Sequence, residues 1–254
     1  MGLFGRIFRV APSDVEQAEQ RLAKRYVIPA DSPLRAEIVV GLSAFPVEIM
    51  NISTSGIRVV LVGDRPIAPG ARCTVRLLVE DMVFKQISIV ANVNLTGGNT
   101  QVGLKYDENK FEDRESLIQL LEPIEVGNSL KEVDAANLTQ TEPGLVARRF
   151  FSAGSTYLTL WRNIEDDALQ GFEFRIHDFF VRNGATPPQL RIYRDDGTQA
   201  FGYSAPTLQQ SNAESREMTR YFNWVVAHIH PDFPADIREF LGQYVTPLAP
   251  AEKG

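Results

Sequence analysis

The sequence is poor in cysteine and in long apolar runs, and it has no excess of basic residues. Its single cysteine, Cys73, excludes an intramolecular disulfide and a cysteine-based zinc site, which favours a reducing cytoplasm. No apolar stretch approaches the length of a membrane span, and no secretory signal pattern is recognisable. The net charge of −6 argues against a general nucleic-acid binder, although local basic patches stay compatible with it. We therefore expect a cytoplasmic protein whose partners do not include nucleic acid.

Recognisable catalytic signatures are also missing, including the nucleophile-elbow serine and the phosphate-binding lysine loop. His228 and His230, with His177, Asp178 and Asp232, invite a metal hypothesis. Histidines at i and i+2 point to different sides of a helix, so we interpret this pair as residues at a helix C-terminus, where partial positive charge suits the dipole. We expect no catalytic residue, no metal and no cofactor. An enzyme with its active site in the C-terminal half is the third-ranked hypothesis.

The composition is that of an ordinary folded protein. The chain has 254 residues, of which 44% are apolar and 23% charged, enough for one large or two modest domains with their own cores. Short runs with strand character, separated by turn residues, fill the region after Leu34. They are residues 36–40, 47–52, 57–62, 73–79, 83–94 and 101–106. Six such strands predict a small closed antiparallel barrel.

Two short motifs lie close to the first of these strands. Arg21 and Arg25 stand four residues apart, so on a helical or turning segment both guanidinium groups point the same way and suit phosphate oxygens and purine edges. Asn51, Ser53 and Gly56 stand where a strand ends and a turn begins, and they offer an amide, a hydroxyl and close backbone approach. Together the motifs predict a receptor for a flat, anionic, purine-bearing ligand.

Each motif also has an ordinary structural interpretation. Two arginines at helical spacing beside Glu16 and Glu19 are typical of a solvated helix face with weak ion pairs. The pattern Asn-x-Ser-x-x-Gly is typical of a turn between strands, because Asn and Ser form local hydrogen bonds and Gly adopts positive φ. The order of the motifs, their spacing and the β-rich stretch that follows favour a binding site.

The pair of motifs resembles the signature of the PilZ family, bacterial receptors of the second messenger cyclic di-GMP, whose pattern is RxxxR followed by [D/N]xSxxG. The resemblance implies that Arg21 and Arg25 grip phosphate and contact guanine. It also implies that Asn51, Ser53 and Gly56 meet the other side of the ligand. Asn51 stands where many members have Asp, which the family pattern allows.

The resemblance covers roughly the first half of the chain. Residues 101–106 look like the final barrel strand of that family, and residues 111–121 like its closing helix, which we expect to end at Pro123. The resemblance implies an N-terminal six-stranded antiparallel barrel flanked by helices. From the residues of the C-terminal half we expect a smaller α+β domain after it, so the expected fold class of the chain is α+β. The first flanking helix is expected to begin at the capping box of Ser13 and Glu16.

We expect four segments in the chain. They are 1–122, an N-terminal helix and barrel; 123–144, an acidic linker; 145–246, an α+β domain of unknown type; and 247–254, a tail. In the third segment the aromatic residues of 150–161 suggest a helix, or a helix followed by a strand. Residues 171–181 and 189–203 suggest strands, the second pair hinged at Asp196-Gly197. Ser211 and Glu214 suggest a capping box before a helix, and residues 236–244 a short last helix.

The resemblance implies an effector in which cyclic di-GMP binding is coupled to a conformational or protein-interaction output, such as control of motility, pili or exopolysaccharide. The C-terminal domain is the expected contact for a protein partner. An alternative is a PilZ adaptor that binds no nucleotide and acts only through protein contacts. Residues 1–10 mix apolar side chains with arginines and leave a membrane contact open, but such a short segment more often packs on its own domain.

Overall fold

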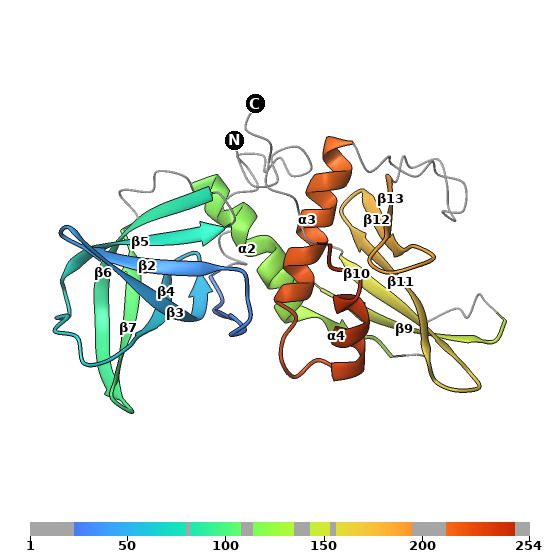
Figure 1. The fold of residues 1–254 in the computed structure, drawn as a ribbon, viewed down its shortest axis with the longest axis horizontal. Coiled ribbons are helices and arrows are strands. Elements are labelled where there is room, and N and C mark those ends of the chain that lie inside the picture. Colours follow the sequence, from blue (N-terminus) through green and yellow to red (C-terminus); the bar gives the residue numbers. More distant parts are fainter. Residues whose placement is uncertain are drawn as a thin grey trace. The chain divides into compact units, whose positions relative to one another are not determined.

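The computed structural model describes residues 23–79, 82–107, 114–134, 143–152, 156–194 and 212–246 (Figure 1). The chain divides between Glu122 and Pro123 into two compact units. The expected N-terminal helix, Arg21 and the Asp196-Gly197 hairpin lie outside the described residues, as do residues 1–10.

The first unit is built on a closed barrel of six antiparallel strands, which confirms the predicted architecture. The strands follow one another around the barrel in the order β3-β2-β5-β6-β7-β4, and pairing between β3 and β4 closes it. Their bounds are β2 (Arg35–Val40), β3 (Ser43–Ser53), β4 (Gly56–Leu61), β5 (Arg72–Val79), β6 (Met82–Thr96) and β7 (Asn99–Tyr106). A further short strand, β1 (Tyr26–Val27), pairs with the outer edge of β3 near its end. Closure leaves the six barrel strands without a free sheet edge.

Alternation of side chains fills the barrel. On β4, Ile57, Val59 and Leu61 are all buried, while the residues between them are half-buried. On β5, Cys73 begins a similar series of alternate buried positions. Burial raises the pKa of the Cys73 thiol to about 11, because the apolar interior disfavours the thiolate. The cysteine is therefore a small core residue.

The helix after the barrel, α2 (Arg114–Ser129), is longer than the sequence suggests. The prediction that Pro123 ends it is wrong, because Pro123 lies inside the helix and the next turns are helical. Proline removes one helical hydrogen bond, but Ile124 and Val126 are buried and their packing offsets that loss. Residues 123–129 are therefore a packed helix, and the predicted linker keeps only its later residues, of which 135–142 lie outside the described part.

The second unit holds a six-stranded antiparallel meander in the order β13-β12-β11-β10-β9-β8. Its strands are β8 (Lys131–Glu132), β9 (Leu145–Phe151), β10 (Tyr157–Asn163), β11 (Leu169–Ile176), β12 (Phe179–Asn183) and β13 (Leu190–Arg194). The helices α3 (Ala213–Ala227) and α4 (Ala235–Gly242) lie on one side of this sheet (Figure 1). Phe172 of the sheet stacks on Phe222 of α3 and meets Phe240 of α4 edge-on. The C-terminal part is thus α+β, as expected.

Three local predictions for this unit need correction. The aromatic stretch 150–161 forms β9 and β10 rather than a helix. Leu158 and Leu160 lie two residues apart on one face of β10, and Phe150 of β9 pairs with Leu158, so all three are buried together. The expected strand 171–181 is a hairpin, β11 and β12, which turns at His177 with φ of 49°. The N-cap of α3 is Asn212, whose side chain accepts a hydrogen bond from the Glu214 N–H at 2.8 Å.

Candidate functional site

The strand β1 brings the second arginine of the first motif to the barrel. Tyr26 and Ile28 are buried and anchor this strand, whereas Val27 between them is 43% exposed. In the register with β3, Tyr26 lies opposite Ile52 and Val27 opposite Asn51. Arg25 is exposed and stands one step before Tyr26, so continuing the antiparallel register places it level with Ser53. The structure thus brings one described residue of the arginine motif beside the second motif.

Asn51 lies on the outer face of the barrel, next to a β-bulge. The register between β3 and β4 shifts between Ile49 and Asn51, after which Asn51 pairs with Arg58. Bulges redirect a side chain locally, and they are frequent beside binding sites. The side-chain oxygen of Asn51 is buried and accepts no hydrogen bond from the described residues. It is therefore an acceptor that a donor group of a ligand can satisfy.

Ser53 shapes the turn that follows β3. Its side chain is fully buried, and its hydroxyl accepts a hydrogen bond from the Ser55 N–H at 3.3 Å. The same hydroxyl donates to the Gly56 carbonyl oxygen, also at 3.3 Å, which joins the two ends of the Thr54-Ser55 turn. In this structure Ser53 is thus a turn-forming residue, and exposed Ser55 is the hydroxyl on the surface of the turn.

Gly56 begins β4 at a point where the barrel leaves no room for a side chain. A Cβ at this position would lie 2.2 Å from the Leu104 carbonyl oxygen of β7. The backbone of the turn also binds β7, because the Tyr106 N–H donates to the Ser55 carbonyl oxygen at 3.0 Å. The glycine of the second motif is therefore required by close packing of β4 on β7.

The sequence of this region matches a known family. Residues 19–122 match the family model of the PilZ domain. The N-terminal half of this chain contains a PilZ domain. The match includes all five motif residues and ends at the boundary between the two compact units.

Solved structures similar to this chain include one PilZ domain. The PilZ domain with c-di-GMP of YcgR from Escherichia coli is 13% identical, over 38% of this chain and 83% of that chain, with a TM-score of 0.31. The Legionella uncharacterized protein Lpg0364 is 16% identical over 39% and 90%, with a TM-score of 0.28. The Borreliella burgdorferi PlzA protein in complex with c-di-GMP is 9% identical over 67% and 85%, with a TM-score of 0.33. None of the curated proteins matches the chain.

Two cations of the PilZ domain near the second motif were not singled out from the sequence. Arg58 pairs directly with Asn51, and exposed Lys105 of β7 pairs with Gly56. Directly paired residues project on the same face of a sheet, so both cations lie on the outer face with the motif. Strand alternation after Gly56 could have found Arg58. The pairing of β4 with β7 joins distant segments, so nothing local in the sequence points to Lys105.

The histidines discussed above belong to the second unit. His228 is fully buried, stacked on Trp224 with a ring separation of 5.0 Å, and its Nδ1 lies 2.6 Å from the Trp224 carbonyl oxygen. His177 is exposed in the turn between β11 and β12. Among the described residues, no group of three or more His, Cys, Asp or Glu side chains is placed to hold a metal ion. Nor does any helix of the described residues combine the length and the apolar character that a membrane span requires.

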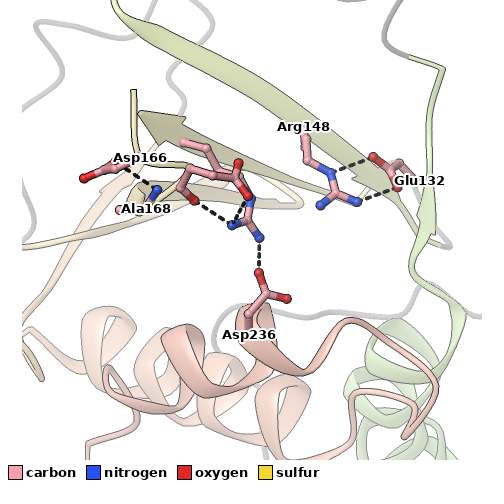
Figure 2. Close-up of polar contacts among 7 residues, drawn as sticks. Glu132, Arg148, Asp166, Ala168 and Asp236 are labelled. Atoms are coloured by element: carbon pink, nitrogen blue, oxygen red, sulfur yellow. Dashed lines mark hydrogen bonds and ion pairs between the residues drawn. The ribbon is translucent and has the colours of Figure 1, made fainter. Parts of the chain in front are cut away.

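A polar cluster in the second unit joins α4 to the sheet (Figure 2). Arg162 of β10 donates hydrogen bonds to the Asp167 carbonyl oxygen and to Asp236 at the start of α4. The bond from Arg162 holds the pKa of Asp236 below its ordinary value of 3.8. Beside it, Arg148 donates two hydrogen bonds of 2.8 Å to Glu132, which lowers the pKa of that carboxyl. Each carboxylate neutralises the arginine from which it accepts. We therefore interpret the cluster as a structural contact between α4 and the sheet.

Proposed function

We propose that this protein is a cyclic di-GMP-binding effector whose ligand lies on the outer face of the PilZ domain. The observation that carries the proposal is the pairing of β1 with β3, which sets Arg25 beside Asn51 and the turn formed by Ser53. The binding residues are those of the two motifs. They are Arg21, Arg25, Asn51, Ser53 and Gly56.

The roles of these residues follow from their chemistry. The guanidinium groups of Arg21 and Arg25 bind the phosphates and stack on guanine. The Asn51 oxygen accepts from a guanine N–H, which satisfies a buried atom that accepts no hydrogen bond within the described part of the chain. The Ser53 hydroxyl stabilises the turn after β3, and Gly56 allows β4 to pack closely on β7, which keeps the outer face of the barrel intact. Arg58, paired with Asn51, supplies a further positive charge.

The output is a change in conformation or in protein contacts that involves the C-terminal α+β unit, in a process such as motility, pili or exopolysaccharide control. A ligand shifts a conformational equilibrium only by its difference in affinity for the two states. Binding of two phosphates by the Arg21 to Arg25 segment provides such a difference. We further propose that the protein acts in the cytoplasm and carries no catalytic residue. The alternative is an adaptor that binds no nucleotide.

The test is calorimetric titration of three variants of the full chain with cyclic di-GMP. Charge-assisted hydrogen bonds contribute about 1.5 to 3 kcal/mol, so Arg25→Ala should lower the affinity about 10- to 100-fold. Arg58→Ala should weaken binding less, because its charge faces the ligand from the neighbouring strand. Arg76→Ala is the matched control. It removes a half-buried arginine of β5 whose guanidinium lies 3.7 Å from the Glu37 carboxylate.

Circular dichroism of each variant separates a lost contact from a lost fold. Arg25 is exposed, so its truncation should leave the spectrum unchanged. Equal affinity of Arg25→Ala and the wild-type chain would contradict the proposed site. If neither Arg25→Ala nor the wild-type chain binds cyclic di-GMP, the adaptor is favoured.

A further inference from the structure

The face of the second unit's sheet that is turned away from α3 and α4 carries an ordered array of aromatic and basic side chains. The register defines its rows, because directly paired residues share a face. The first row crosses all six strands and holds aromatic and basic residues alone. It consists of Lys131, Phe151, Tyr157, Arg175, Phe180 and Tyr193.

The next two rows continue the pattern. The second row consists of Arg149, Thr159, Glu173, Arg182 and Arg191. The third consists of Ala147, Trp161 and Gly171. We call these three rows the aromatic-arginine face. It holds five basic residues and one acidic residue, in a chain whose net charge is −6. The average charge of the chain therefore does not describe this face.

The basic groups are held in place over the rings. The Arg149 guanidinium lies 4.9 Å from the centre of the Tyr157 ring, and that of Arg175 lies 5.1 Å from the Phe180 ring. Arg149 also donates a hydrogen bond of 3.0 Å to the Thr159 hydroxyl. Guanidinium planes and aromatic rings are both surfaces on which nucleobases stack, and the guanidinium charge attracts phosphate. Phe151 is 44% exposed, so part of its ring is directly accessible.

The side chains of the face distinguish between two kinds of anionic partner. Aromatic residues and arginine are enriched in protein interfaces as well, but an acidic peptide offers no flat base to stack on the rings and guanidinium planes of the three rows. An antiparallel sheet whose rings and arginines are partly exposed is the kind of surface that binds single-stranded nucleic acid. Between β9 and β13 the face extends about 19 Å, at about 4.8 Å per strand, which accommodates several nucleotides.

We propose that the aromatic-arginine face binds single-stranded nucleic acid, with bases stacked on its rings and guanidinium planes. Phosphates pair with its basic residues other than Arg182, which donates hydrogen bonds to Glu173. This activity goes beyond the proposed nucleotide receptor and involves none of the motif residues of the PilZ domain. It departs from the expectation drawn from net charge, because the basic residues are gathered on one sheet face.

The first test is fluorescence anisotropy of labelled 12-nucleotide oligouridylate and oligothymidylate with the full chain. Binding should be saturable and should weaken with salt, with a slope of log K against log salt of about −3 for four phosphate contacts. Trp161 lies on the face, whereas Trp224 of α3 is buried and stacks on His228. Stacking of a base on Trp161 should therefore quench part of the tryptophan emission. Absence of saturable binding at low salt would overturn the proposal.

Matched charge reversals locate the binding. Arg191→Glu should lower the affinity about tenfold, and since Arg191 is exposed, the fold should be retained. Arg216→Glu, the same change at an exposed residue of α3, should leave the affinity unchanged, because α3 lies on the other side of the sheet. Phe151→Ala should lower the affinity without altering the salt slope. Equal effects of the two reversals would overturn the assignment to this face.

A further control separates the proposal from its alternatives. A poly-glutamate peptide is added as a competitor of the oligonucleotides. If it displaces them and binds equally tightly, the face would be assigned to acidic proteins, which would contradict the proposal. Arg25→Ala should keep full oligonucleotide affinity while its affinity for cyclic di-GMP falls. The two proposed activities can therefore fail independently.

Discussion

Replacement of Gly56 by alanine tests whether this glycine belongs to the barrel itself. The added Cβ would meet the Leu104 carbonyl oxygen at 2.2 Å, well inside van der Waals contact, and this oxygen belongs to backbone that cannot turn aside. Overpacking of this kind costs about 1 to 3 kcal/mol of folding free energy. For a domain of about 100 residues, each kcal/mol lowers Tm by about 4 °C or more.

Unfolding in urea followed by far-ultraviolet circular dichroism measures this cost. Both tryptophans, Trp161 and Trp224, lie in the second unit, so their emission serves as an internal reference for that unit. Gly242→Ala is the matched control, because its Cβ would meet nothing within 4 Å at the end of α4. We expect it to be neutral or slightly stabilising. An unfolding midpoint of Gly56→Ala equal to that of the wild-type chain would refute the packing argument.

Three further predictions concern single side chains. Asn212→Ala removes the N-cap of α3 and should lower the free energy of unfolding by about 0.5 to 2 kcal/mol; an unchanged urea midpoint would contradict this role. The pKa of Cys73 is raised to about 11, so a thiol reagent at pH 8 should modify it rapidly only in denaturant, and rapid reaction of the native protein would disprove its burial. Asp236 has a lowered pKa, so its bond from Arg162 stabilises the fold above pH 3.8 and this contribution is lost as the pH falls through the lowered value. Thermal unfolding between pH 6 and pH 3 should therefore show a steeper loss of stability for the wild-type chain than for Asp236→Asn, and parallel curves would argue against the pairing.

The barrel was predictable because its signals are local. Alternating apolar residues such as Ile57, Val59 and Leu61, with turn residues between runs, indicate strands wherever one face is buried. The continuation of α2 through Pro123 was not predictable, since a local rule is overridden there by burial of Ile124 and Val126. In such a case only tertiary packing decides.

The second motif shows the same limit at the candidate site. Its position at the end of a strand follows from the sequence, and the structure places it there. The reason for Gly56 does not follow from the sequence, because Leu104 lies far along the chain and meets it only through closure of the barrel. The same holds for the pairing of β1 with β3, which brings Arg25 beside Ser53. Long-range strand pairing is the information that local patterns lack.

The aromatic stretch 150–161 shows why the second unit was harder to predict. Its aromatic residues fit both a helix and a strand over short windows, and β9 and β10 become evident only from their pairing with each other. The register then reveals which side chains share a face. Tyr157 and Arg175 are distant in sequence but directly opposite in the sheet, so the aromatic-arginine face has no signature along the chain.

The central claim is best tested by a calorimetric titration of the purified full chain with cyclic di-GMP. We expect saturable binding, with a stoichiometry that distinguishes one bound nucleotide from an intercalated pair. We also expect cyclic di-AMP to bind more weakly, because adenine lacks the N1–H and 2-amino donors of guanine from which the Asn51 oxygen accepts in the proposed complex. The absence of both heat and thermal stabilisation at high cyclic di-GMP concentration would contradict the account.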